Sequence, residues 1–133
     1  MVHLLFNEGI KADDVHSIRQ SVQAEAAQAG LGAQQGFVMI FVVDELVCNV
    51  MEHAQAASLE LRIEADTKGF KCQLVDDGQP FDTAGSVKSA AKEDMKGEGD
   101  RRLGLNLIGR LVDDVTYERT ADGKNQVVLA KAW

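Results

Sequence analysis

Two groups of polar residues in this sequence have the types and the spacing of a ligand site. Glu45 and Asn49 are four positions apart, so they share one face of any helix that contains both. Their neighbours in residues 37–50 are too apolar for a solvated surface helix. Burying a carboxylate and an amide is costly unless each finds a polar partner. We expect that partner to be a ligand.

The second group is the segment Asp-Asp-Gly-Gln-Pro-Phe-Asp at residues 76–82, which directly follows the strand-like residues 70–75. Taken alone, this segment is typical of a plain turn after a strand. An acidic and amide pair on a helix is also common at protein surfaces. The order of the two groups along one chain is much more specific than either group is alone.

Length and composition restrict the class of protein. With 133 residues the chain has room for one domain with a real core, and 45% apolar with 26% charged residues is ordinary for a soluble globular protein. A net charge of −7 argues against a nucleic-acid partner, because phosphates would be repelled. No signal peptide and no window of about 18 apolar residues is evident. We therefore expect a cytoplasmic protein that does not bind membranes.

The two cysteines, Cys48 and Cys72, are far apart in sequence, and each lies inside an apolar segment. Isolated cysteines of this kind are typical of reduced core residues and not of a disulfide or metal framework. The sequence predicts that both thiols are buried.

Hydrophobic periodicity predicts the order of the structural elements. Strands are expected at residues 2–7, 59–65, 70–75, 115–119 and 126–130, and helices at residues 12–30, 34–54 and 103–112. Residues 78–102 are small and polar and predict a long loop, of a length that is usually functional or disordered. Strands joined as hairpins favour an α+β fold, with a mostly antiparallel sheet and helices on one face.

Together these features resemble the Bergerat-fold ATP-binding domains, and among them the small bacterial anti-sigma factor serine kinases of partner-switching systems. Residues 45–54 (Glu-Leu-Val-Cys-Asn-Val-Met-Glu-His-Ala) are similar to that family's N-box, and residues 76–82 to its first glycine box. Residues 102–108 (Arg-Leu-Gly-Leu-Asn-Leu-Ile) are similar to the end of its second glycine box. The resemblance covers nearly the whole chain.

The resemblance implies one histidine-kinase-like ATPase domain over residues 1–133. This domain would be a two-layer α/β sandwich with a mixed, mostly antiparallel sheet and helices on one face. The ATP lid would span about residues 83–102. ATP and Mg²⁺ would be the cofactors. Asn49 would be the protein ligand of the metal, which prefers hard oxygen ligands. Glu45 would be the general base for an attacking hydroxyl.

The same resemblance assigns the nucleotide contacts. Asp76 would accept a hydrogen bond from the adenine amino group, and Gly78 would let the backbone approach the base because it has no Cβ. At the place where the chain departs from the family, Arg101 or Arg102 would contact the γ-phosphate as a charged donor. Gly104 and Leu105, at the start of a helix, would present backbone N–H groups to the phosphates.

The chain departs from the family at one place. The Gly-x-Gly that usually precedes the Leu-Gly of the second glycine box is replaced by Asp100-Arg101-Arg102. This departure favours an alternative in which the protein is a catalytically impaired nucleotide-binding or protein-binding module. The intact Glu45 and Asn49 favour an active kinase. A third alternative, the catalytic domain of a split histidine kinase, fits the Pro-Phe-Asp of the first glycine box less well.

The resemblance also implies partners. The kinase would phosphorylate a STAS-domain anti-sigma antagonist and sequester a sigma factor or a similar target, and a homodimer is common in the family. Arg19 lies on the first predicted helix, at the end of the domain where family members bind partners. An arginine that is only solvated would give the same sequence pattern.

Overall fold

The computed structural model describes residues 1–92 and 103–133. They form a five-stranded sheet in the order β1-β2-β3-β5-β4. Its strands are β1 (Val2–Phe6), β2 (Leu59–Ala65), β3 (Gly69–Asp76), β4 (Asp114–Arg119) and β5 (Asn125–Ala132). Every neighbouring pair is antiparallel, which confirms the prediction from hairpin connectivity. All five strands lie within two residues of their predicted bounds.

Buried and exposed residues alternate along the strands, so the two faces of the sheet differ. In β2, Leu59, Leu61 and Ile63 are buried, whereas Arg62 and Glu64 between and after them are exposed. The paired residues of β3 continue the pattern, since Ile63 pairs with Cys72 and Leu61 with Leu74, and all four are buried. One face is therefore the core face and the other is polar.

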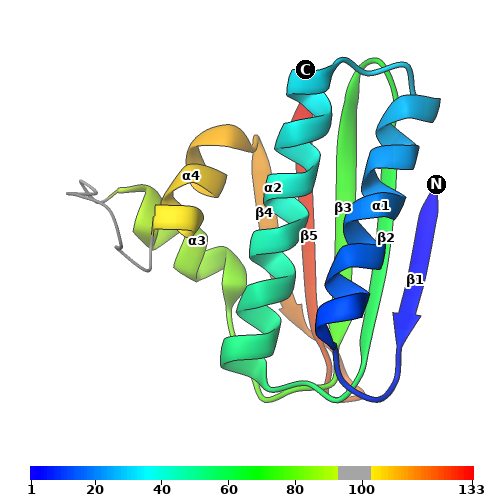
Figure 1. Ribbon diagram of the computed structural model, residues 1–133. Coiled ribbons are helices and arrows are strands. Elements are labelled where there is room, and N and C mark those ends of the chain that lie inside the picture. Colours follow the sequence, from blue (N-terminus) through cyan, green and yellow to red (C-terminus); the bar gives the residue numbers. More distant parts are fainter. Residues whose placement is uncertain (93–102) are drawn as a thin grey trace.

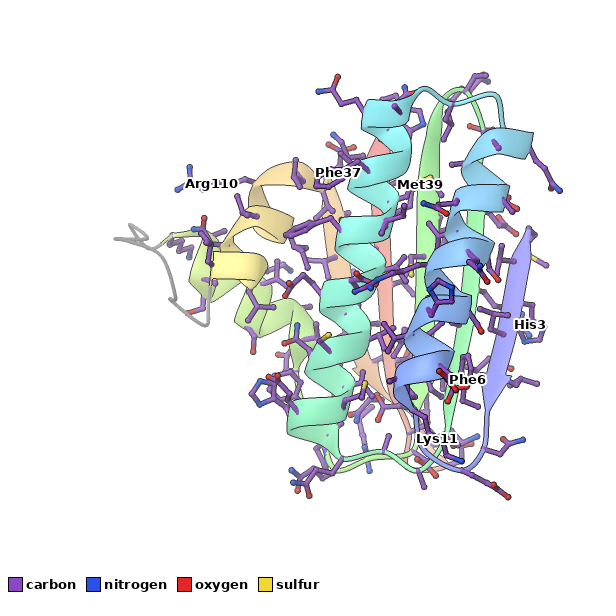
Figure 2. All side chains as sticks on the ribbon, viewed as in Figure 1. His3, Phe6, Lys11, Phe37, Met39 and Arg110 are labelled. Atoms are coloured by element: carbon purple, nitrogen blue, oxygen red, sulfur yellow. The ribbon has the colours of Figure 1, made fainter. Side chains whose placement is uncertain are left out.

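Helices α1 (Ala12–Gln28) and α2 (Ala33–Asn49) lie side by side over the core face of the sheet (Figure 1). Helix α2 is apolar on more than one side: Met39 is fully buried and points toward α1, whereas Phe37 lies on the side toward α4 and is 67% exposed (Figure 2). Helix α1 contributes Ile18 and Val22 to the same core. The resulting two-layer arrangement confirms the predicted fold class.

The end of the long apolar helix differs from a regular α-helix. Val50–Ala54 forms a π-helical turn, η1, which directly continues α2. The backbone N–H of Gln55 donates to the carbonyl of Val50 at 3.1 Å, and Gln55 then ends the turn in a left-handed conformation with φ of 53°. Such turns are rare and occur often at functional sites.

The predicted loop is partly wrong, because residues 83–91 are helical. Helix α3 (Thr83–Ala91) begins after Asp82, whose side-chain Oδ1 accepts a hydrogen bond of 2.8 Å from the backbone N–H of Gly85. Its buried residues are small, which explains the missed helix: Thr83, Ala84, Val87 and Ala90 give a weak hydrophobic period. Helix α4 (Leu103–Leu111) packs against α3, and the Asn106 Nδ2 donates to the Ala90 carbonyl at 2.8 Å.

The prediction for the cysteines holds for Cys72, which is fully buried in β3, and is wrong for Cys48, which is exposed. Because residues 37–50 are apolar on several faces, the sequence did not reveal which face of α2 points outward. Burial raises the pKa of the Cys72 thiol to about 12. Within the described ranges, no helix is both long enough and apolar enough to cross a membrane.

Candidate functional site

Glu45 lies in the last two turns of α2 and is half-buried. Burial raises the pKa of its carboxyl group above the ordinary value, and the nearby negative charges of Asp44 and Glu52 raise it further. The neighbouring Asp44 is itself paired, since its Oδ2 accepts a hydrogen bond of 2.8 Å from the Arg19 Nε on α1. A carboxylate with a raised pKa is a better proton acceptor, which is what a general base requires.

Asn49 is the last residue of α2 and only 7% exposed. Its side-chain Nδ2 is buried and has no hydrogen-bond partner among residues 1–92 and 103–133. A buried amide without a partner is unfavourable in a closed core. Because the two ends of an amide can be exchanged by a flip, this orphaned end is available to a ligand as a donor or as a carbonyl oxygen.

The described residues contain no group of three or more His, Cys, Asp or Glu that could hold a metal alone. Mg²⁺ commonly takes only one or two protein ligands and completes its shell with phosphates and water. A single amide oxygen on a buried helix end therefore fits a magnesium that arrives with a nucleotide. Asn49 is the residue that would hold it.

The start of α4 lies directly against Glu45. A Cβ built on Gly104 would overlap the Glu45 carboxylate and would lie 2.7 Å from its Oε1. The structure thus brings together two predicted site residues from segments 59 positions apart. The side chain of Leu105 is buried in the core, so only its backbone N–H is available to a ligand. Arg102 lies outside the described residues.

Asp76, at the end of β3, is 2% exposed. Its Oδ1 accepts two hydrogen bonds, 2.9 Å from the backbone N–H of Gly78 and 3.0 Å from the side-chain Nδ2 of Asn125. Its Oδ2 accepts none from the part of the chain that the structure describes. Burial raises the pKa of this carboxyl group, and the two hydrogen bonds oppose that effect. The arrangement fixes one oxygen and leaves the other free, among the described residues, to accept a hydrogen bond.

Asn125, at the start of β5, is a site residue that the sequence did not indicate. It is 1% exposed, and its Nδ2 also donates to the Gln79 carbonyl at 2.8 Å. Its Oδ1 accepts hydrogen bonds from the Tyr117 hydroxyl at 2.8 Å and from Arg119 Nη1 at 3.1 Å. One amide thereby ties the final hairpin to the segment at residues 76–79. An asparagine after Asp-Gly-Lys reads as an ordinary turn residue, so no local signal marked it.

Gly78 is required by a contact within the protein. A Cβ at this position would collide with the backbone carbonyl of Ala54, the last residue of η1. Gln79 makes two further links to the same turn, from its backbone N–H to the Ala54 carbonyl at 2.9 Å and from its Nε2 to the His53 carbonyl at 2.7 Å. The predicted N-box and first glycine box are therefore packed against each other through η1.

A ring stack and a carboxylate add further contacts near the junction of the N-box and the first glycine box. The rings of His53 and Phe81 stack with centroids 4.7 Å apart. The Oδ1 of Asp77 accepts hydrogen bonds from the backbone N–H groups of Ser58 at 2.8 Å and Ala57 at 2.9 Å, and the Ser58 bond is the main cause of its lowered pKa. Asp76 and Asp77, adjacent in sequence, thus have different roles: one faces the site and the other anchors a loop.

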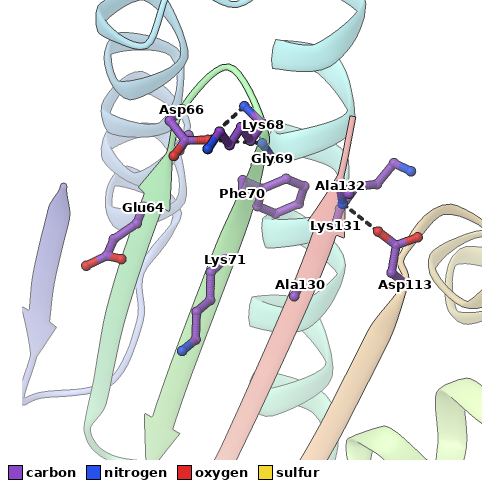
Figure 3. A pocket seen from close by; sticks show the side chains of 11 residues that line it. Glu64, Asp66, Lys68, Gly69, Phe70, Lys71, Asp113, Ala130, Lys131 and Ala132 are labelled. Carbon is purple, nitrogen blue, oxygen red and sulfur yellow. Dashed lines mark hydrogen bonds between the residues drawn. The ribbon is translucent and has the colours of Figure 1, made fainter.

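A cavity of about 410 Å³ lies elsewhere, near the turn between β2 and β3 and the end of β5 (Figure 3). Two of its three carboxylates are used within the protein: Asp66 accepts from the Lys68 and Gly69 backbone N–H groups, and Asp113 accepts from the Ala132 N–H. Glu45, Asn49 and Asp76 do not line it. Its residues carry none of the chemistry described above.

The fold, with the predicted N-box packed against the predicted first glycine box, is that of an ATPase-type domain. Comparison with known protein families gives the same class. The chain belongs to the family described as the histidine kinase-like ATPase domain, whose family pattern matches residues 10–131. This membership confirms the predicted Bergerat-type resemblance. No curated protein sequence matches the chain significantly.

A solved structure of similar fold is entitled the SiaB-SiaC complex from Pseudomonas aeruginosa. The similarity covers 96% of this chain and 88% of that one, with a TM-score of 0.73 and 15% sequence identity. At that identity the match supports the fold alone.

Proposed function

We propose that this chain is an ATP-dependent protein serine kinase and anti-sigma factor. It phosphorylates a STAS-domain antagonist in a bacterial partner-switching pathway and acts in the cytoplasm as one domain. The observation that carries the proposal is the end of α2. There a carboxylate with a raised pKa lies four residues before a buried amide that has no partner within the described part of the chain. In a purely structural helix, a buried amide without a partner would only be unfavourable.

In this proposal Asp76 selects adenine, because its Oδ2 accepts a hydrogen bond from the exocyclic amino group while Oδ1 is held by Asn125 and Gly78. Guanine presents a carbonyl oxygen at the corresponding edge, which would repel a carboxylate. Gly104 and Leu105 present backbone N–H groups in the first turn of α4, which attract phosphate. Arg102 is assigned to the γ-phosphate and residues 83–102 to the ATP lid.

Glu45 accepts the proton of the serine hydroxyl. The serine oxygen forms a bond to the γ-phosphorus as the bond from that phosphorus to ADP breaks and ADP leaves. Asn49 holds the magnesium, which, when bound, neutralises phosphate charge. The transferred phosphate adds negative charge to the antagonist and weakens the complex, which frees the kinase to bind a sigma factor or a similar target.

An aromatic pair on α2 supports a protein partner, since Phe37 is exposed and Phe41 beside it is partly buried. Phe37 and Phe41 stack with ring centroids 6.5 Å apart on α2, and their spacing places them on the same helix face as Glu45. Large exposed aromatic side chains are common at protein interfaces. The SiaB-SiaC complex, in which a protein of similar fold is bound to another protein, is consistent with this idea. A homodimer remains part of the proposal.

The test is transfer of the labelled γ-phosphate of ATP to the STAS-domain proteins of the source organism, with wild type and Glu45→Gln compared. We expect one STAS protein to be labelled on serine by wild type, and its labelling to fall at least 100-fold with the variant. No labelling by wild type, with ATP binding intact, would reject the kinase.

The second candidate is a regulatory binding module without phosphotransfer. The replacement of the family's Gly-x-Gly by Asp100-Arg101-Arg102, which lies outside the described residues, favours it. This module would bind the same STAS partner whether or not ATP is present, and Glu45→Gln would have no effect on it.

A further inference from the structure

The close approach of Gly104 to Glu45 is specific to one side chain. The three atoms nearest to a Cβ built on Gly104 all belong to the Glu45 carboxylate: Oε2, Cδ and, at 2.7 Å, Oε1. No backbone atom of another element is among them. The missing side chain of Gly104 therefore leaves a volume that this carboxylate occupies.

No other described group holds Glu45 in place. Its carboxylate makes no hydrogen bond or ion pair with residues 1–92 or 103–133, whereas the adjacent Asp44 pairs with Arg19. The surroundings of Glu45 are repulsive, since Asp44 and Glu52 both act on it as like charges. A long side chain in such surroundings has several staggered conformations available, and the one observed needs the space beside Gly104.

We infer that Gly104 is a positioning residue for the general base: the volume left free by its missing Cβ determines where the Glu45 carboxylate lies. This inference rests on the proposed function, in which Glu45 accepts a proton. It gives the glycine a role separate from phosphate binding. An added methyl group leaves the backbone N–H of residue 104 in place, so a phosphate contact through that N–H survives it, whereas the carboxylate must rotate away.

The two roles predict different kinetics for Gly104→Ala. If the glycine positions Glu45, the variant binds ATP with magnesium within about twofold of wild type by calorimetry, and its kcat for phosphate release from ATP falls at least tenfold. If the glycine serves only the approach of phosphates, the affinity falls instead and kcat at saturation is retained. That second result would overturn the inference.

A double-mutant cycle tests the same point without assuming the size of any effect. In a Glu45→Ala background there is no carboxylate to displace. Gly104→Ala then causes no further loss in the residual rate. An equal fold-loss in both backgrounds would show that the methyl group acts on something other than Glu45, and would overturn the inference.

Melting temperatures give a readout that does not depend on activity. Alanine favours helix over glycine, so Gly104→Ala raises Tm in the Glu45→Ala background. In the wild-type background the crowded carboxylate cancels or reverses that gain. The matched control is Gly36→Ala on α2, whose added methyl meets only the Ala26 Cβ at an ordinary 3.6 Å and changes Tm equally in both backgrounds.

The outcomes separate the inference from the proposed function. An equal Tm change from Gly104→Ala in the two backgrounds would reject the contact itself. A coupled Tm change with kcat unaffected in Gly104→Ala would reject the positioning role. A coupled Tm change in a protein whose wild type neither hydrolyses nor transfers phosphate would reject the kinase and leave the contact between Gly104 and Glu45 established.

Discussion

The side-chain Nδ2 of Asn125 donates a hydrogen bond of 3.0 Å to the Oδ1 of Asp76 across 49 positions of sequence. The same amide donates to the Gln79 carbonyl and accepts from Tyr117 and Arg119. Every polar atom of this buried side chain thus has a partner, and the network holds Asp76 with one oxygen committed and the other open. Networks of this kind are rigid when complete and costly when broken.

Removing the amide should therefore destabilise the whole domain. Asn125→Ala removes a partner from the buried Asp76 carboxylate and from the partly buried Tyr117 hydroxyl, and we expect the free energy of unfolding to fall by about 1–3 kcal/mol. Urea unfolding followed by circular dichroism measures it. The control is Gln126→Ala, next to it on the polar face of β5, which should change stability by less than about 0.5 kcal/mol. Equal effects of the two variants would mean that the network is not stabilising.

Asp76→Asn should separate stability from ligand binding. The new amide oxygen can still accept from Gly78 and Asn125, and the cost of burying a charge disappears. We therefore expect a Tm equal to or above that of wild type, together with loss of ATP binding, because an N–H₂ group would face the adenine amino group. A variant that melts well below wild type would contradict this account of Asp76.

The same substitution has a defined pH dependence. Burial raises the pKa of Asp76, so the folded chain retains this proton at pH values where the unfolded chain has lost it. The stability that this group contributes is complete below its unfolded pKa and is lost as pH rises through its folded pKa. The advantage of Asp76→Asn over wild type should thus grow with rising pH across that interval and then level off. Unfolding free energies measured from pH 3 to pH 7 test the sign.

Gly78 should tolerate no side chain for a reason internal to the protein. An added methyl group would collide with the Ala54 backbone carbonyl, which also accepts a hydrogen bond from Gln79. We expect Gly78→Ala to lower the free energy of unfolding by about 1–3 kcal/mol, the range typical of overpacking. Gly36→Ala is again the control and should be neutral or slightly stabilising. If Gly78→Ala folds with wild-type stability, the close approach of the two backbones is not as the structure has it.

The two cysteines should differ in reactivity. Cys48 is exposed, whereas Cys72 is fully buried with a pKa raised to about 12. We expect a thiol reagent to modify one thiol in the native protein and two in urea. The native reaction should be slow at neutral pH, because partial burial and the Glu45 charge raise the pKa of Cys48 as well. Mass spectrometry of Cys48→Ser, which should be unmodified when native, identifies the thiol.

Sequence patterns were sufficient for features that depend on near neighbours in the chain. The alternation of Leu59, Leu61 and Ile63 fixed a strand and its buried face, and the i,i+4 spacing of Glu45 and Asn49 placed both on the last turns of one helix. Helix 83–91 was missed because alanines and a single valine give too weak a period. The exposure of Cys48 was missed because its helix is apolar on several sides.

Other features depend on contacts between distant segments and leave no local trace. Asn125 meets Asp76 only because β5 pairs with β3, with those two residues in register. Gly104 meets Glu45 only through the packing of α4 on α2. The π-helical turn at Val50–Ala54 likewise has no evident signal in its own sequence, and it lies against Gly78 and Gln79 from a distant segment.

The proposed function requires that the junction of α2, η1 and the end of β3 binds ATP with magnesium. Its most direct test is a calorimetric titration of the purified protein with ATP, with and without Mg²⁺, beside Asn49→Ala and Asp76→Asn. We predict that wild type binds, that Asp76→Asn does not, and that Asn49→Ala binds without any dependence on magnesium. Wild-type protein that shows no binding at millimolar ATP, or an Asp76→Asn variant that binds as wild type does, would contradict the account.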